Sequence, residues 1–189
     1  VLESLVTARA ILGDEKLQVN DNSAGVALFK LAVEEAPTPL PERLFNEIVS
    51  KFPANLFYRD QRAAALEIAE AIEKKAAGNA KQLLNLATFY LGIESGSDAK
   101  RLAEAAIAID PASVTAYQTL GLSHRLNFDL EESARAYFKA MELDGGKGAA
   151  SDGAGAGVVV GVGVGLDIAP DRAQPVNASM KTKSAVTSR

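Results

Sequence analysis

Apolar residues recur every three or four positions along the first 144 residues, the spacing expected of one face of an α-helix. Proline, glycine and polar clusters interrupt this spacing at short intervals. In the third predicted helix, residues 41–52, Pro41 falls in the first turn, where proline is tolerated, and Pro53 lies just past the end of that helix. The pattern predicts eight helices in four pairs, with little room for a sheet. They cover residues 2–12, 23–36, 41–52, 55–78, 80–93, 97–110, 114–126 and 130–143.

The last four predicted helices form two units of equal length. Residues 80–113 align with residues 114–147 without a gap, so a unit of two helices recurs after 34 residues, from residue 80 to residue 114. We call this interval the repeat length. This length of about 34 residues, with small and large residues at set places, resembles the tetratricopeptide repeat. The residues that match are Leu83, Leu86, Ala87, Tyr90, Ala99, Ala106 and Pro111 in the first unit, and Tyr117, Leu120, Gly121, Asp129, Tyr137 and Ala140 in the second.

The match to the repeat family is incomplete. Where the family has a bulky aromatic, a tyrosine, an alanine and a closing proline, this chain has Ala103, His124, Ser133 and Gly145. Upstream of residue 80 the helical spacing persists, but the intervals no longer match the repeat length. We therefore interpret residues 1–79 as two degenerate helical-repeat pairs, residues 80–147 as two tetratricopeptide units and residues 148–189 as a low-complexity tail or linker.

The resemblance implies an all-α, right-handed superhelix, a tetratricopeptide-like solenoid that ends in a disordered or irregular Gly-rich tail. It also implies a concave groove, lined by the first helix of each unit, that binds an extended peptide or a partner helix. Side chains not used for stacking face that groove. Carried over position by position, the groove-facing candidates are Lys81, Leu84, Asn85, Thr88, Thr115, Gln118, Thr119, Leu122 and Arg125.

These groove candidates are mostly uncharged and polar. Amide and hydroxyl groups can hydrogen-bond a peptide backbone, which suits the recognition of extended segments. The alternative is that they are ordinary exposed helix residues. A clamp for a C-terminal carboxylate, found in chaperone-binding members, is disfavoured, because Thr115 and Thr119 stand where Lys and Arg are required and only Asn85 fits.

Charge and composition exclude several classes of partner. Residues 1–147 carry 16 Lys/Arg against 21 Asp/Glu, a net charge of −5 without a basic stripe, which argues against nucleic acid. No apolar run approaches the roughly 20 residues that span a bilayer, so we expect no membrane insertion. The chain has no cysteine, and thus no disulfide or thiolate site. The compartment is not determined by the sequence. A cytoplasmic location is slightly favoured, but a signal segment that precedes Val1 in the gene product would not be seen in this chain.

Catalytic chemistry finds no support in the residues. His124 is the only histidine, which excludes a multi-histidine metal site; it replaces a packing tyrosine and is expected at a helix interface. The carboxylates, as in Glu70 with Lys74, have spacings typical of solvated helix faces. We therefore predict that the chain is not an enzyme and binds no metal and no cofactor.

The Gly-rich stretch "GAGAGVVVGVGVG" at residues 153–165 is the most motif-like segment. No register places a third glycine as a dinucleotide fingerprint requires, and no Gly-Lys-Ser/Thr follows. The segment after Asp144 is interpreted either as a natural linker or as a truncated or frame-shifted continuation of the array. Sequence alone thus favours a protein-binding scaffold. The alternative is a regulatory or docking segment of a larger enzyme or secreted assembly.

Overall fold

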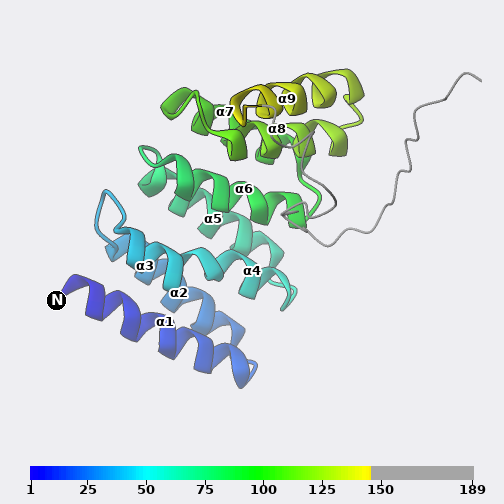
Figure 1. Cartoon of the computed structure of the whole chain (residues 1–189). Helices are drawn as coiled ribbons and strands as arrows, with labels where there is room; N and C mark the ends of the chain where they lie inside the picture. The colour runs from blue at the N-terminus through cyan, green and yellow to red at the C-terminus, as the bar shows by residue number, and fades with distance from the viewer. Residues whose placement is uncertain (146–189) are drawn as a thin grey trace, which may run out of the picture. The chain divides into compact units, whose positions relative to one another are not determined.

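The computed structural model describes residues 1–145, and all of their regular elements are helices (Figure 1). The predicted Gly-rich tail, including residues 153–165, lies outside the described residues. The elements are α1 (Leu2–Gln18), α2 (Asn22–Glu35), α3 (Glu42–Glu47), the 3-10 helix η1 (Val49–Lys51), α4 (Phe52–Phe57), α5 (Arg62–Ala76), α6 (Ala80–Gly92), α7 (Gly96–Ile109), α8 (Val114–Leu126) and α9 (Leu130–Leu143).

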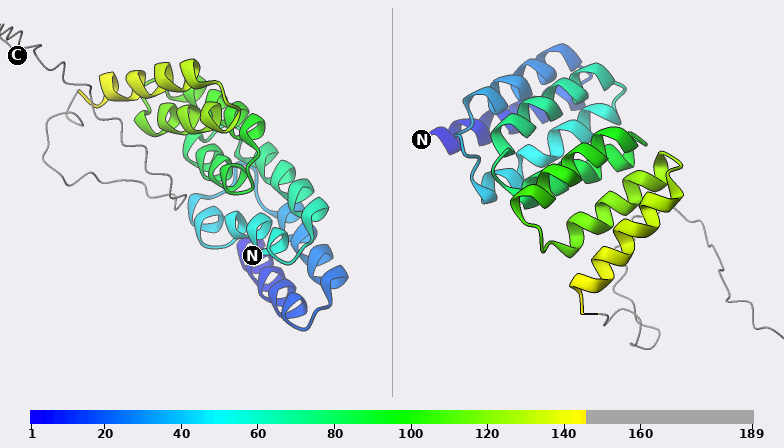
Figure 2. Two further views of the ribbon diagram at one scale, coloured as in Figure 1. Left: turned by 90° about the vertical axis from the view of Figure 1, so that its right-hand side faces the viewer. Right: turned by 90° about the horizontal axis from the view of Figure 1, so that it is seen from above.

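The helices pack as four successive pairs. Within the pairs α1 contacts α2, α4 contacts α5, α6 contacts α7 and α8 contacts α9, and the pairs join through contacts of α2 with α5, α5 with α6, and α8 with both α6 and α7. The turned views show each pair stacked on the next (Figure 2). The predicted fold class, an all-α superhelix of the tetratricopeptide type, is confirmed over these residues. We call the leading helices of the pairs (α1, α3–α4, α6 and α8) the first helices, and α2, α5, α7 and α9 the second helices.

Capping residues set where several helices begin. Asp21, Asn79 and Ser113 each precede a helix, and each side chain accepts a hydrogen bond from the backbone N–H three residues on, at 3.3, 3.2 and 3.3 Å. Such caps satisfy an otherwise unpaired donor of the first turn and contribute about 1 kcal/mol each. The starts of α2, α6 and α8 are therefore fixed locally.

A left-handed residue marks the turn inside each pair. Asp60, Glu94 and Phe128 have φ values of 61°, 61° and 63° and follow one another at the repeat length, whereas Asn20, with φ of 61°, precedes Asp60 by a longer interval. The expectation that residues upstream of residue 80 do not keep the repeat length is therefore wrong for the second pair. The spacing extends over residues 46–79, and only the first pair departs from it, because the connection between α2 and α3 is longer than the later ones.

The first helix of the second pair is broken, which corrects two predicted boundaries. Pro53 does not follow a helix but stands in the first turn of α4. Proline has no N–H to donate to the carbonyl four residues earlier, and the chain changes to η1 just before it. The long helix predicted for residues 55–78 is also interrupted, because the left-handed turn at Asp60 separates α4 from α5.

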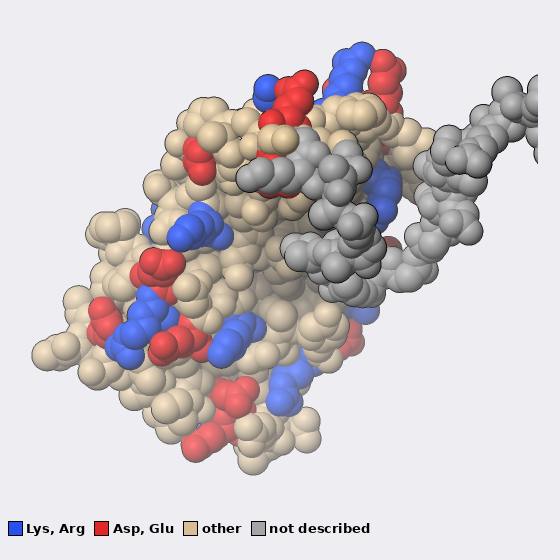
Figure 3. Space-filling model, viewed as in Figure 1, with Lys and Arg blue, Asp and Glu red and all other residues tan. Residues whose placement is uncertain are grey.

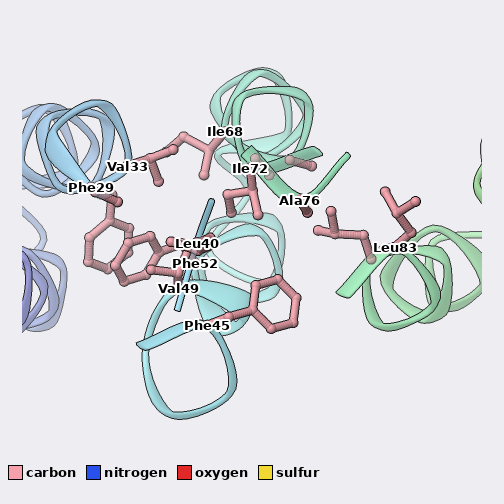
Figure 4. Close-up of a cluster of buried hydrophobic side chains, with 14 of the residues drawn as sticks. Phe29, Val33, Leu40, Phe45, Val49, Phe52, Ile68, Ile72, Ala76 and Leu83 are labelled. Atoms are coloured by element: carbon pink, nitrogen blue, oxygen red, sulfur yellow. The ribbon is translucent and has the colours of Figure 1, made fainter. Parts of the chain in front are cut away.

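The same buried positions recur in successive pairs. Val49, Phe52 and Leu56 stand one repeat length before Leu83, Leu86 and Tyr90, and all six are buried. Figure 4 draws part of the core that includes Val49, Phe52 and Leu83, and there the ring of Phe52 lies against that of Phe29 on α2. The two rings are stacked, with centroids 4.2 Å apart. This contact joins the first pair to the second.

Small residues let the two helices of a pair approach closely. A Cβ placed on Gly13 would lie 2.6 Å from the ring of Phe29, and one on Gly121 would lie 2.9 Å from the ring of Tyr137. At the equivalent place the second and third pairs have Pro53 and Ala87. This place, called the small position below, therefore holds glycine in the first and fourth pairs, alanine in the third and the larger proline in the second.

Long polar side chains fasten the connection between α2 and α3. The ammonium group of Lys75 on α5 donates hydrogen bonds to the carbonyls of Glu34 and Ala36, at 3.1 and 2.6 Å. Gln82 on α6 is 2 % exposed, and its Nε2 donates to the carbonyl of Leu40 at 2.8 Å. The connection is thereby bonded to the second and third pairs.

Candidate functional site

The first helices present equivalent positions side by side. When the four pairs are aligned on their left-handed turn residues, two positions of the first helices face the same way in each pair. The first position holds Ile11, Lys51, Asn85 and Thr119, and the second holds Asp14, Ala54, Thr88 and Leu122. Residues at these two positions line hollows between consecutive first helices. Both hollows lie on the face where the residues predicted to bind a partner are found.

The first hollow lies between α1 and the α3–α4 segment and has a volume of about 490 Å³. Buried residues contribute to its lining, chiefly Phe29 and Phe52. Polar and charged side chains surround these rings. The remaining lining residues are Thr7, Ala10, Ile11, Asp14, Glu15, Gln18, Glu47, Ile48, Lys51 and Asn55.

The second hollow lies between α4 and α6 and has a volume of about 230 Å³. Its lining combines aromatic and apolar side chains with hydroxyl and amide groups. The lining residues are Ser50, Ala54, Tyr58, Asn85, Thr88, Phe89, Gly92 and Ile93. Tyr58 is 81 % exposed, so a large apolar surface with a polar tip faces solvent beside the hollow.

Most of the predicted groove residues are accessible. Asn85 and Thr88 line the second hollow, although the hydroxyl of Thr88 also donates to the carbonyl of Leu84 at 3.1 Å. The others lie along α6 and α8, and each is exposed or half-buried. They are Lys81, Thr115, Gln118, Leu122 and Arg125.

Two predicted groove residues are buried, which corrects the expectation that they face a ligand. Leu84 is 8 % exposed and Thr119 is 7 % exposed. Leu84 belongs to the continuous apolar core. The hydroxyl of Thr119 donates to the carbonyl of Thr115 at 2.8 Å, so it is already satisfied within α8. Neither side chain is available in the way that Asn85 is.

Sequence reasoning missed the part of the site that lies on α1 and α3–α4. Lys51, Tyr58 and Ile11 were not among the candidates, because the repeat spacing was followed only from residue 80 onward. The signal was present, since Val49, Phe52 and Leu56 repeat the spacing of Leu83, Leu86 and Tyr90. Pro53 hid it by interrupting the helix.

Charges are unevenly distributed along the first helices. The first hollow is lined by the carboxylates of Asp14, Glu15 and Glu47 and by one ammonium group, that of Lys51. Further along, the exposed Lys81 and Arg125 are cationic. In Figure 3 charged side chains of both signs lie over α1 and the α3–α4 segment and also at the α7–α9 end, and this face shows no single basic patch.

The interior holds polar side chains in structural contacts. His124 is 6 % exposed, and its Nδ1 lies 3.3 Å from Oδ2 of Asp129, which agrees with the predicted helix-interface position. Burial raises the pKa of Tyr90 to about 12, with a further contribution from the Asp98 carboxylate. Within residues 1–145 no group of three or more His, Asp or Glu side chains is arranged to hold a metal ion.

Taken together, the stacked pairs and the hollowed face of the first helices define a tetratricopeptide-like α-solenoid. Over the part of the chain that the structure describes, no helix combines the length and the apolar character needed to cross a membrane.

No protein-family model and no curated protein sequence matches the chain. Among solved structures it is similar to "Crystal structure of MamA", at 19 % identity over 76 % of this chain and 81 % of that one, with a TM-score of 0.49. It is also similar to "MamA 41-end from Desulfovibrio magneticus RS-1", at 21 % identity over 75 % and 77 % of the two chains, with a TM-score of 0.47. At these values the likeness does not bear on function.

Proposed function

We propose that this chain is a non-catalytic scaffold of the tetratricopeptide type whose first helices bind an extended segment or a helix of a protein partner. The proposed binding surface, called the groove below, comprises the residues lining the two hollows together with Lys81, Thr115, Gln118, Leu122 and Arg125. Hollows with apolar lining and a few polar groups are the usual form of ligand sites in proteins.

The observation that carries the proposal is that the α3–α4 segment serves both hollows. Lys51, Phe52 and Asn55 line the hollow against α1, whereas Ser50, Ala54 and Tyr58 line the hollow against α6. The two hollows therefore flank one short segment of chain. A partner segment laid across η1 and α4 would contact both.

The chemistry of the second hollow suits a peptide. The Asn85 amide can donate to and accept from a peptide backbone, and the rings of Tyr58 and Phe89 offer apolar contact for a side chain. These rings lie close together through Phe57, whose ring centroid is 6.2 Å from each of them. Aromatic groups anchored in this way give a large contact area.

Site-specific photo-crosslinking in cells of the organism from which the chain comes tests the proposal. A photoreactive amino acid at Asn85 should give covalent adducts with a defined protein. The same amino acid at Glu70, an exposed position on the second helix α5, is the matched control and should not give that adduct. A Tyr58→Ala substitution should reduce the adduct formed from position 85. Equal labelling from both positions, or no adduct from position 85, would contradict the proposal.

A further inference from the structure

We infer that the hollow between α1 and α4 is a pocket for a lysine or arginine side chain of the bound partner segment. This inference rests on the proposed binding function of the groove and specifies the chemistry of its ligand. It concerns the lining residues of the first hollow, which we call the acidic pocket.

The lining of the acidic pocket is suited to both ends of a long basic side chain. Ile11, which is 56 % exposed, and the half-buried Ile48 offer apolar contact to an aliphatic stem, and the buried rings of Phe29 and Phe52 form the floor beneath them. The carboxylates on α1 and α3 offer acceptors to a cationic head. Lysine and arginine combine an aliphatic stem with a charged tip in this way, whereas an acidic side chain would meet like charge.

The pocket is not neutralised by its own residues. Its three carboxylates face one ammonium group, that of Lys51, which leaves a net charge of −2. Within the described residues Asp14 and Glu15 form no ion pair; Asp14 accepts a hydrogen bond from the Gln18 amide at 3.0 Å. Glu47 has a long contact of 3.8 Å with Arg43. A cation from the partner would therefore meet available carboxylates.

The equivalent positions on later first helices do not repeat this charge. Asp14 corresponds to Ala54, Thr88 and Leu122. Glu47 corresponds to Lys81, so that the sign of the charge is reversed. A basic residue is thus favoured at one end of the groove only. This fixes the register of a bound segment, since its basic residue lies over α1 and α4 and another part of the segment lies over α6.

Peptide selection tests the inference without knowledge of the natural partner. A random library of twelve-residue peptides is selected on the full chain, and the strongest binder is synthesised. We expect Lys or Arg at a fixed position of the selected peptides. Replacing that residue by norleucine, which keeps an aliphatic stem without charge, should weaken binding about fivefold, the size of a partly exposed ion pair. High salt should weaken binding of the original peptide more than that of the norleucine peptide.

A charge-matched pair of protein variants locates the interaction. The double variant Asp14→Asn/Glu15→Gln should bind the original peptide about fivefold more weakly and should no longer distinguish it from the norleucine peptide. The control Glu34→Gln/Glu70→Gln removes the same charge from exposed positions of α2 and α5 and should bind like the unaltered chain. Equal far-ultraviolet circular dichroism of both variants excludes unfolding.

The inference and the proposed function fail in different ways. Selected peptides without a basic preference that lose binding on Asn85→Ala would overturn the acidic pocket and leave the groove standing. Peptides with a basic residue whose binding is unchanged by Asp14→Asn/Glu15→Gln would also overturn it. If no selected peptide loses binding when groove residues such as Asn85 or Asp14 are substituted, both the acidic pocket and the proposed function are contradicted.

Discussion

The second and third helix pairs keep the same register with different backbones. In the third pair α6 is continuous from Ala80 to Gly92, whereas residues 42–57 of the second pair form α3, η1 and α4. Yet α5 and α7 begin one repeat length apart, at Arg62 and Gly96, and the same positions are buried. The difference teaches that buried side chains and the left-handed turn maintain the repeat, while an unbroken first helix is dispensable.

Exchanging alanine and proline at the small position of the third and second pairs should give the largest change in the free energy of unfolding. Ala87→Pro places a proline inside α6, where it removes a hydrogen bond and clashes with the preceding turn. We expect a loss of at least about 3 kcal/mol in the free energy of unfolding, measured by urea denaturation. The reverse change, Pro53→Ala, should alter it by less than about 1 kcal/mol, because the site restores an N–H but loses part of a buried ring. Comparable losses for both variants would show that the second pair does not tolerate the proline in the way we describe.

The same position in the first pair measures how closely the helices approach. Gly13→Ala brings a Cβ within 2.6 Å of the buried Phe29 ring, and we expect a loss of about 2 kcal/mol from overpacking. Gly92→Ala is the matched control, because nothing lies within 4 Å of its added Cβ, and it should be neutral or slightly stabilising. Thermal denaturation of the two variants decides the point; an unchanged midpoint for Gly13→Ala would refute the close contact.

Tyr90 and Leu56 hold the same place in the third and second pairs, and only Tyr90 titrates. Its pKa is raised to about 12, mainly by burial. Because the folded-state pKa is above the ordinary value of about 10, the associated stability is present below that value and is lost as the pH rises through the folded-state pKa. At pH 11 the loss is about 1 kcal/mol. Tyr90→Phe should therefore reduce the decline in unfolding free energy between pH 9 and pH 11, and a decline of unchanged size would contradict this.

The ion pair between the second and third pairs should contribute least. Arg101 on α7 donates to both carboxylate oxygens of Glu73 on α5, one contact being 2.9 Å. Arg101 is half exposed, so solvent screens the interaction, and we expect Arg101→Met to cost under about 1 kcal/mol. A double-mutant cycle with Glu73→Gln isolates the pair. A coupling energy well above that value would show that the polar contact, rather than apolar stacking, holds the two pairs together.

Much of the fold could be predicted from the sequence because helices with regular apolar spacing determine their own packing face. The units at residues 80–113 and 114–147 combine that spacing with capping residues such as Asn79 and Ser113. Residues 46–79 lack a continuous pattern, since the first helix is broken before Pro53 and Asp60 turns the chain before α5. The apolar spacing of Val49, Phe52 and Leu56 is present in the sequence, but the breaks around it make the repeat harder to recognise there.

The candidate site was less predictable than the fold for a related reason. Family positions indicated Asn85 and Thr88 on α6, and both line a hollow. Burial of Leu84 and Thr119 depends on how far neighbouring helices approach, which spacing along one helix does not determine. The acidic pocket needs α1 and α3–α4 side by side, and the longer interval between them concealed that arrangement.

The fastening of the connection between α2 and α3 has a consequence for how the array opens. In a solenoid whose units contact only their neighbours, units can unfold singly from an end. Here Gln82 of the third pair holds Leu40, and Lys75 of the second holds Ala36. The junction after the first pair therefore loses bonds when either later pair opens. We therefore expect the first three pairs to open together, so that backbone amides of α2 and α6 have similar opening free energies in hydrogen exchange.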